Sequence, residues 1–117
     1  MSIKERFKVI ISDLDGTLLN NEHQISEYTK TVFQQLHDEK YLIIVATGRH
    51  HLDAMHLLES LGCPFYLVTS NGARIHSPTK ELIYSFDIKS EAIKSILDLD
   101  IDPEFTTVLF KEKVWQT

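Results

Sequence analysis

The fold is decided by the stretch Val9-Ile10-Ile11-Ser12-Asp13-Leu14-Asp15-Gly16-Thr17. Residues 7–12 are mostly apolar and β-branched without strict alternation, which is typical of a strand covered on both faces in a parallel sheet. The turn-forming residues that follow predict a loop with a small hairpin over 13–24. Two carboxylates, Asp13 and Asp15, are therefore expected at the carboxyl end of a buried strand.

The same pattern recurs twice further along the chain. Further strands are predicted at 41–46 and 65–69, and helices at 26–40 and 51–61. Strands that alternate with helices at this spacing predict right-handed crossovers and a parallel, doubly wound sheet. The fold class indicated is α/β, a parallel sheet with flanking helices.

After residue 73 the pattern changes. Residues 74–76 and 81–86 alternate around a turn and predict two antiparallel strands. A short helix capped by Ser90 and a last strand or hairpin arm over 105–115 are expected next. The second part of the chain is therefore expected to be α+β.

Composition bounds the class of protein. The chain has 117 residues with 43% hydrophobic and 25% charged residues, which is ordinary for one globular domain. The net charge of −5 argues against a nucleic-acid partner, because backbone binding needs clustered Lys and Arg. A single cysteine, Cys63, forms no internal disulfide, and no apolar run reaches the length of a membrane span or signal core. We expect a cytoplasmic protein with no membrane partner.

Polar residues end all three strands of the first part. In open α/β sheets the carboxyl ends of the strands bind ligands, so these side chains are expected to meet at one crevice. Asp13 and Asp15 lie two residues apart, on one side of a chain that is extended there, and would repel each other and a phosphate. Hard carboxylate oxygens beside a phosphate favour Mg²⁺ as the cofactor.

At these residues the chain resembles the haloacid dehalogenase (HAD) superfamily. The run 9–19 is similar to its first motif, and Ala46-Thr47-Gly48-Arg49 is similar to its second. Residues 70–73 resemble the Cof-type branch, close to pyridoxal-phosphate and sugar-phosphate phosphatases. The resemblance implies the N-terminal half of a Rossmann-like core over 1–73 and the beginning of a cap over 74–117.

The resemblance also implies catalytic roles for the two carboxylates. Asp13 would be the nucleophile that forms an aspartyl phosphate, and it would bind Mg²⁺. Asp15 would be the general acid and base, with its backbone carbonyl on the metal. The implied activity is hydrolysis of small phosphorylated metabolites such as sugar phosphates or pyridoxal phosphate.

The other implied site residues bind phosphate. The Leu14 amide and the Thr47 hydroxyl would each hold a phosphoryl oxygen, and Gly48 would leave the adjacent amide accessible. Asn71 is a secondary candidate, because a turn explains it at least as well as substrate contact. For Arg49, an ion pair that fixes the loop is a stronger interpretation than substrate steering.

The sequence departs from the family in one respect. The lysine of motif three and the acidic motif four are absent, so a C-terminally truncated chain is expected. Two alternatives follow: an inactive fragment that binds phosphate or a partner without turnover, and a phosphomutase or phosphotransferase of the same superfamily. An unpaired strand edge also predicts self-association.

Overall fold

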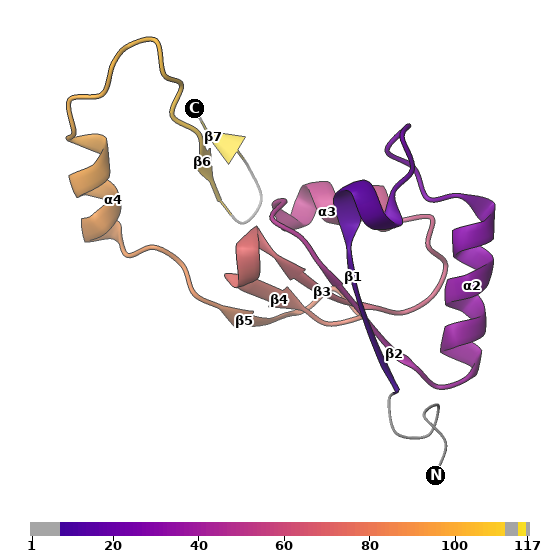
Figure 1. Cartoon of the computed structure of the whole chain (residues 1–117). Helices are drawn as coiled ribbons and strands as arrows, with labels where there is room; N and C mark the ends of the chain where they lie inside the picture. Colours follow the sequence, from indigo (N-terminus) through magenta and orange to yellow (C-terminus); the bar gives the residue numbers. More distant parts are fainter. Residues whose placement is uncertain (1–7, 112–114, 117) are drawn as a thin grey trace. The chain divides into compact units, whose positions relative to one another are not determined.

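The computed structural model describes residues 8–111 and 115–116, and these residues divide between Ser85 and Phe86 into two compact units (Figure 1). The first unit holds a five-stranded sheet in the order β1-β2-β3-β4-β5. Its strands are β1 (Val9–Asp13), β2 (Leu42–Ala46), β3 (Tyr66–Thr69), β4 (Arg74–His76) and β5 (Leu82–Ser85).

The direction of the strands follows the sequence pattern. β1, β2 and β3 are parallel, and β4 and β5 are antiparallel, as the pattern predicted. β4 and β5 continue the same sheet, and the first compact unit extends to Ser85. The division of the chain into 1–73 and 74–117 stays a prediction.

The first long helix begins where its capping residue predicts it. α2 (Glu27–Asp38) has Ser26 at its N-cap, and the Ser26 hydroxyl accepts a hydrogen bond from the Thr29 amide at 3.2 Å. α3 (His51–Leu58) is shorter than predicted. The predicted loop after β1 begins with a tight turn, Leu14–Leu18, in which Asp15 and Gly16 have non-helical backbone angles.

One core fills the space between these helices and one face of the sheet. It contains Phe33 of α2, Ala54 and Leu58 of α3, and the strand residues Val45 and Leu67. Leu14 is also fully buried in this cluster. The core therefore fixes both the sheet and the turn that follows β1.

The second unit contains α4 (Ser90–Leu97), β6 (Leu109–Phe110) and β7 (Trp115–Gln116). The predicted Ser90 cap is wrong, because Ser90 is the first helical residue and Lys89 holds the cap position without a side-chain hydrogen bond. The predicted strand over 105–115 is reduced to β6 and β7, and residues 112–114 lie outside the described part. No helix within 8–111 or 115–116 is long and apolar enough to cross a membrane.

Candidate active site

Strand register brings the predicted site residues to one edge of the sheet. Asp13 lies opposite Ala46, and Ala46 lies opposite Val68, so the three strands end at nearly the same level, with β3 reaching Thr69. The Thr47 amide donates to the Val68 carbonyl at 2.9 Å, and the Ser70 amide donates to the Arg49 carbonyl at 2.9 Å. The loops after β1, β2 and β3 therefore form one continuous polar edge, as the sequence predicted.

The turn after β1 fixes the position of the first carboxylate. Asp13 is the last residue of the strand, and its Oδ1 accepts a hydrogen bond from the Leu14 amide at 2.8 Å. The Leu19 amide closes the turn on the Leu14 carbonyl at 3.0 Å. Gly16 has φ +72°, a conformation that favours glycine, inside this turn. The strand thus ends at Asp13, and Asp15 lies in the turn that follows it.

Arg49 forms the strongest polar contact of the site. Its Nε and terminal nitrogen donate to the two Asp15 carboxylate oxygens at 2.7 and 2.8 Å, in a bidentate geometry. Its other terminal nitrogen donates to Asp53 in the first turn of α3 at 3.1 Å. The sequence favoured an ion pair for Arg49, and this prediction is confirmed.

This ion pair controls the charge of Asp15. The hydrogen bonds from Arg49 hold the pKa of the Asp15 carboxyl below its usual range, although partial burial acts in the opposite direction. The ion pair therefore favours the ionised form of Asp15 and makes its carboxylate a weaker base. To donate a proton, its carboxyl must first be released from Arg49.

Arg49→Gln is expected to raise the pKa of Asp15 toward its ordinary value. Because Arg49 lowers the pKa of Asp15, the Arg49–Asp15 pair stabilises the folded state at neutral pH. This stabilisation is lost as pH falls through the Asp15 pKa of the folded protein. The pair is partly exposed, so Arg49→Gln is expected to lower the free energy of unfolding at neutral pH by less than about 1 kcal/mol. Carboxyl NMR titration and urea unfolding at pH 7 and pH 3 measure both effects. An unchanged Asp15 titration would contradict the assignment, and Lys30→Gln on α2 is the control.

Thr47, Gly48 and Asn71 lie in the loops that follow β2 and β3. The buried Thr47 hydroxyl accepts the Arg49 amide at 3.1 Å, which leaves its own proton to donate to a ligand. A Cβ atom at Gly48 would lie 2.8 Å from Oδ1 of Asn71, so glycine is required for this close approach. The structure therefore brings Asn71 against the second motif.

Gly48→Ala is expected to displace the Asn71 side chain and to destabilise the protein by about 1 kcal/mol, the low end for overpacking. The cost is small because the contact is with the end of an exposed side chain. In an Asn71→Ala background the same change should cost little. A double-mutant cycle in urea measures the coupling, and equal costs in both backgrounds would contradict it.

The oxygen donors at Asp13 fit part of a magnesium shell. Mg²⁺ binds through one or two carboxylates and completes its shell with water and substrate phosphate. Asp13 would provide one carboxylate oxygen and Asp15 its backbone carbonyl, since the Asp15 carboxylate is occupied by Arg49. Within 8–111 and 115–116, no group of three His, Cys, Asp or Glu side chains is placed to hold a metal.

Three histidines near the site pack against one another inside the unit. His50 and His51 rings lie 4.3 Å apart, and His51 stacks on His76 at 4.6 Å. All three are buried. The His50 ring also accepts the Leu52 amide at the start of α3, so the packing role favoured for His50 and His51 is confirmed.

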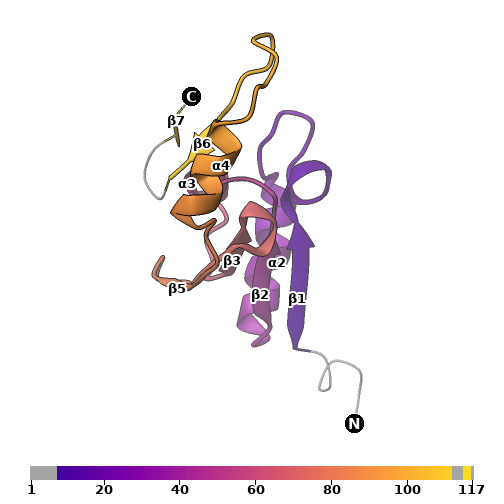
Figure 2. The same cartoon turned by 90° about the vertical axis from the view of Figure 1, so that its left-hand side faces the viewer.

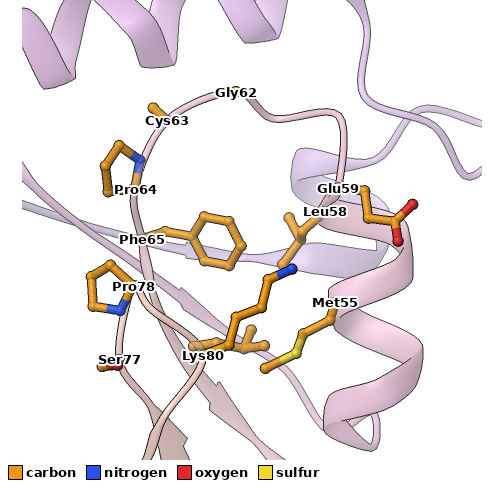
Figure 3. Close-up of a pocket in the computed structure, with 11 residues that line it drawn as sticks. Met55, Leu58, Glu59, Gly62, Cys63, Pro64, Phe65, Ser77, Pro78 and Lys80 are labelled. Atoms are coloured by element: carbon orange, nitrogen blue, oxygen red, sulfur yellow. The ribbon is translucent and has the colours of Figure 1, made fainter.

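A cavity of about 410 Å³ lies elsewhere, between the end of α3 and the β4–β5 turn (Figure 3). Phe65, at the start of β3, lines it, whereas the carboxylates lie at the other end of the sheet. Cys63 also lines the cavity, and burial raises the pKa of its thiol. This cavity is therefore separate from the candidate active site, and Cys63 acts as a small buried apolar residue.

Comparison with known proteins agrees with this geometry. Residues 10–117 match the haloacid dehalogenase-like hydrolase family. The chain belongs to this family. A putative phosphatase of Buchnera aphidicola subsp. Baizongia pistaciae is 42% identical over 91 residues, which are 78% of this chain and 34% of that protein.

Two further proteins match this chain over a similar share of their own length. An HMP-PP phosphatase of Cronobacter sakazakii is 33% identical over 90% of this HAD-family chain and 39% of its own length. The structure of a haloacid dehalogenase-like hydrolase from B. subtilis has a TM-score of 0.71 and 37% identity, over 78% of this chain and 32% of its own. The chain thus spans 32–39% of the length of these three proteins.

Sequence reasoning missed Asp53 as part of the site. Its only signal was its place four residues after Arg49, where side chains meet on a helix. The Asp15 partner of Arg49 had no local signal, because 34 residues separate the two. Leu14 was predicted only as a phosphate donor, yet its side chain is also a core residue.

Proposed function

We propose that the chain carries the nucleophile half of a Mg²⁺-dependent phosphomonoester hydrolase that acts on small phosphorylated metabolites. The observation that carries this proposal is the joint placement of Asp13, Asp15 and Thr47 at the carboxyl ends of adjacent parallel strands. The relatives named as phosphatases support the same class of reaction.

The chemistry follows from the roles of these groups. Asp13 attacks the phosphorus atom in line, and the bond to the leaving oxygen breaks as the aspartyl phosphate forms. Asp15, freed from Arg49 and protonated, gives the leaving oxygen its proton and then takes one from the attacking water. Thr47 and backbone amides bind the phosphoryl oxygens, and bound Mg²⁺ would offset their charge.

A phosphate-release assay tests this proposal. The purified chain is incubated with sugar phosphates and pyridoxal phosphate, with Mg²⁺ and with a chelator. We expect release that requires Mg²⁺ and stops in the chelator. Release that is equal in both conditions would contradict the metal role, and no release would contradict hydrolysis by the chain as it stands.

A second candidate function is favoured by the acidic side chains of the described residues, no three of which lie close enough together to hold a metal ion. Under this alternative the chain binds phosphate or a protein partner without turnover. Titration with inorganic phosphate and Mg²⁺, followed by amide NMR shifts at Leu14 and Gly48, separates the two functions. Saturable shifts without phosphate release would support binding alone.

A further inference from the structure

The cavity between the end of α3 and the β4–β5 turn takes no part in the proposed hydrolysis. Its volume of about 410 Å³ falls within the range of small-molecule sites, about 300–1,000 Å³. Figure 2 shows β5 and β1 at opposite edges of the sheet, and Asp13 ends β1. A ligand in this cavity would therefore leave the carboxylates of the candidate active site accessible.

The walls of the cavity are apolar. Its most buried lining residues are Leu58 of α3 and Leu67 of β3, which are both 1% exposed and belong to the core. Pro64 and Pro78 also line it, and a proline has no backbone N–H to donate. Water in such a space finds few hydrogen-bond partners, so an apolar group displaces it favourably.

Two partly buried side chains favour an aromatic group in this space. Met55 of α3 and Phe65 before β3 line the cavity and pack against the core. The thioether of a methionine and the ring of a phenylalanine both make favourable contacts with an aromatic ring. The walls therefore suit a ring better than a flexible polar chain.

A cation stands at the edge of the cavity. The β4–β5 turn holds Lys80, because its amide donates to the Ser77 carbonyl at 2.9 Å and its φ is +68°. Figure 3 shows the Lys80 side chain extending from this turn toward α3. Within residues 8–111 and 115–116, the Lys80 ammonium forms no ion pair.

An anion lines the same cavity at the end of α3. Glu59 is 69% exposed in its side chain, and its carboxylate lies 3.9 Å from the exposed ring of His56. In the described part of the chain Glu59 and Lys80 do not pair with each other. A ligand with one charge would be attracted by one of them and repelled by the other, whereas a zwitterion matches both.

We propose that this cavity binds a free α-amino acid with an aromatic side chain. The ring would lie against Met55 and Phe65, the α-carboxylate would meet Lys80, and the α-ammonium would meet Glu59. Burial of the ring supplies affinity, and the two charges supply selectivity.

Titration of the purified 117-residue chain with L-phenylalanine tests the proposal. Amide NMR shifts at Phe65 and Lys80 and calorimetry are expected to show saturable binding at one site. Two analogues each lack one charge: 3-phenylpropionate has no ammonium, and 2-phenylethylamine has no carboxylate. Each is expected to bind at least about threefold more weakly, the scale of one exposed ion pair. Glycine, which has both charges and no ring, is expected to give no saturable shift.

Two substitutions separate the charges of the site. Lys80→Gln and Glu59→Gln are each expected to weaken L-phenylalanine binding at least about threefold. Lys40→Gln is the matched control, because Lys40 is also an exposed lysine with positive φ, +70°, and it should bind like the parent. Circular dichroism of each variant verifies that the fold is retained.

Three results would overturn the proposal. The first is no saturable binding of L-phenylalanine by the folded chain. The second is equal binding of the two analogues that lack one charge, which would indicate a site for any aromatic molecule. The third is unchanged affinity in both Lys80→Gln and Glu59→Gln. The readout is binding, so failure of the proposed hydrolysis would leave this test unaffected.

Discussion

Asp13→Asn is expected to lower phosphate release by at least about 10,000-fold, the scale seen when covalent hydrolases lose their nucleophile. The amide nitrogen cannot attack phosphorus, and a neutral side chain also weakens the hold on Mg²⁺. The asparagine Oδ1 can still accept the Leu14 amide, which Asp13 does at 2.8 Å. The loss of activity is therefore expected without a loss of fold.

Steady-state phosphate release with Mg²⁺ measures this effect. Asp38→Asn, the same chemical change at the end of α2, is the matched control and should retain the parent rate. Urea unfolding of Asp13→Asn should match that of the parent within about 0.5 kcal/mol. Activity within tenfold of the parent would show that Asp13 is not the nucleophile.

Leu14→Ala is expected to destabilise the protein by about 2–5 kcal/mol, the range for deleting a buried leucine side chain. Leu14 is 0% exposed and belongs to the same core as the helices, although it lies between the two carboxylates. The cavity left by the substitution would remove the anchor of the turn after β1. A loss of this size is a large part of the stability of a small domain.

Urea unfolding followed by circular dichroism measures this loss. Ile11→Ala is the matched control, because Ile11 lies three residues earlier and is 68% exposed. Its expected effect is within about 0.5 kcal/mol. Equal losses in the two variants would show that the turn after β1 is not held by the core.

The strands and the polar residues at their carboxyl ends could be predicted from the sequence. Apolar runs of five or six residues followed by Asp, Thr or Ser indicate a buried strand and its end, because both signals are local. The first motif identified the carboxylates and the family for the same reason. The helix starts were less certain, since Ser26 is a true cap and Ser90 is not.

Only the tertiary structure decided which groups meet. Arg49 pairs with Asp15 and His51 stacks on His76 because sheet register and loop paths bring distant residues together, and local patterns do not encode these. The sequence by itself determined the family, the parallel strands and the two carboxylates. The lowered pKa of Asp15 depends on long-range packing, so it appears only in the folded chain.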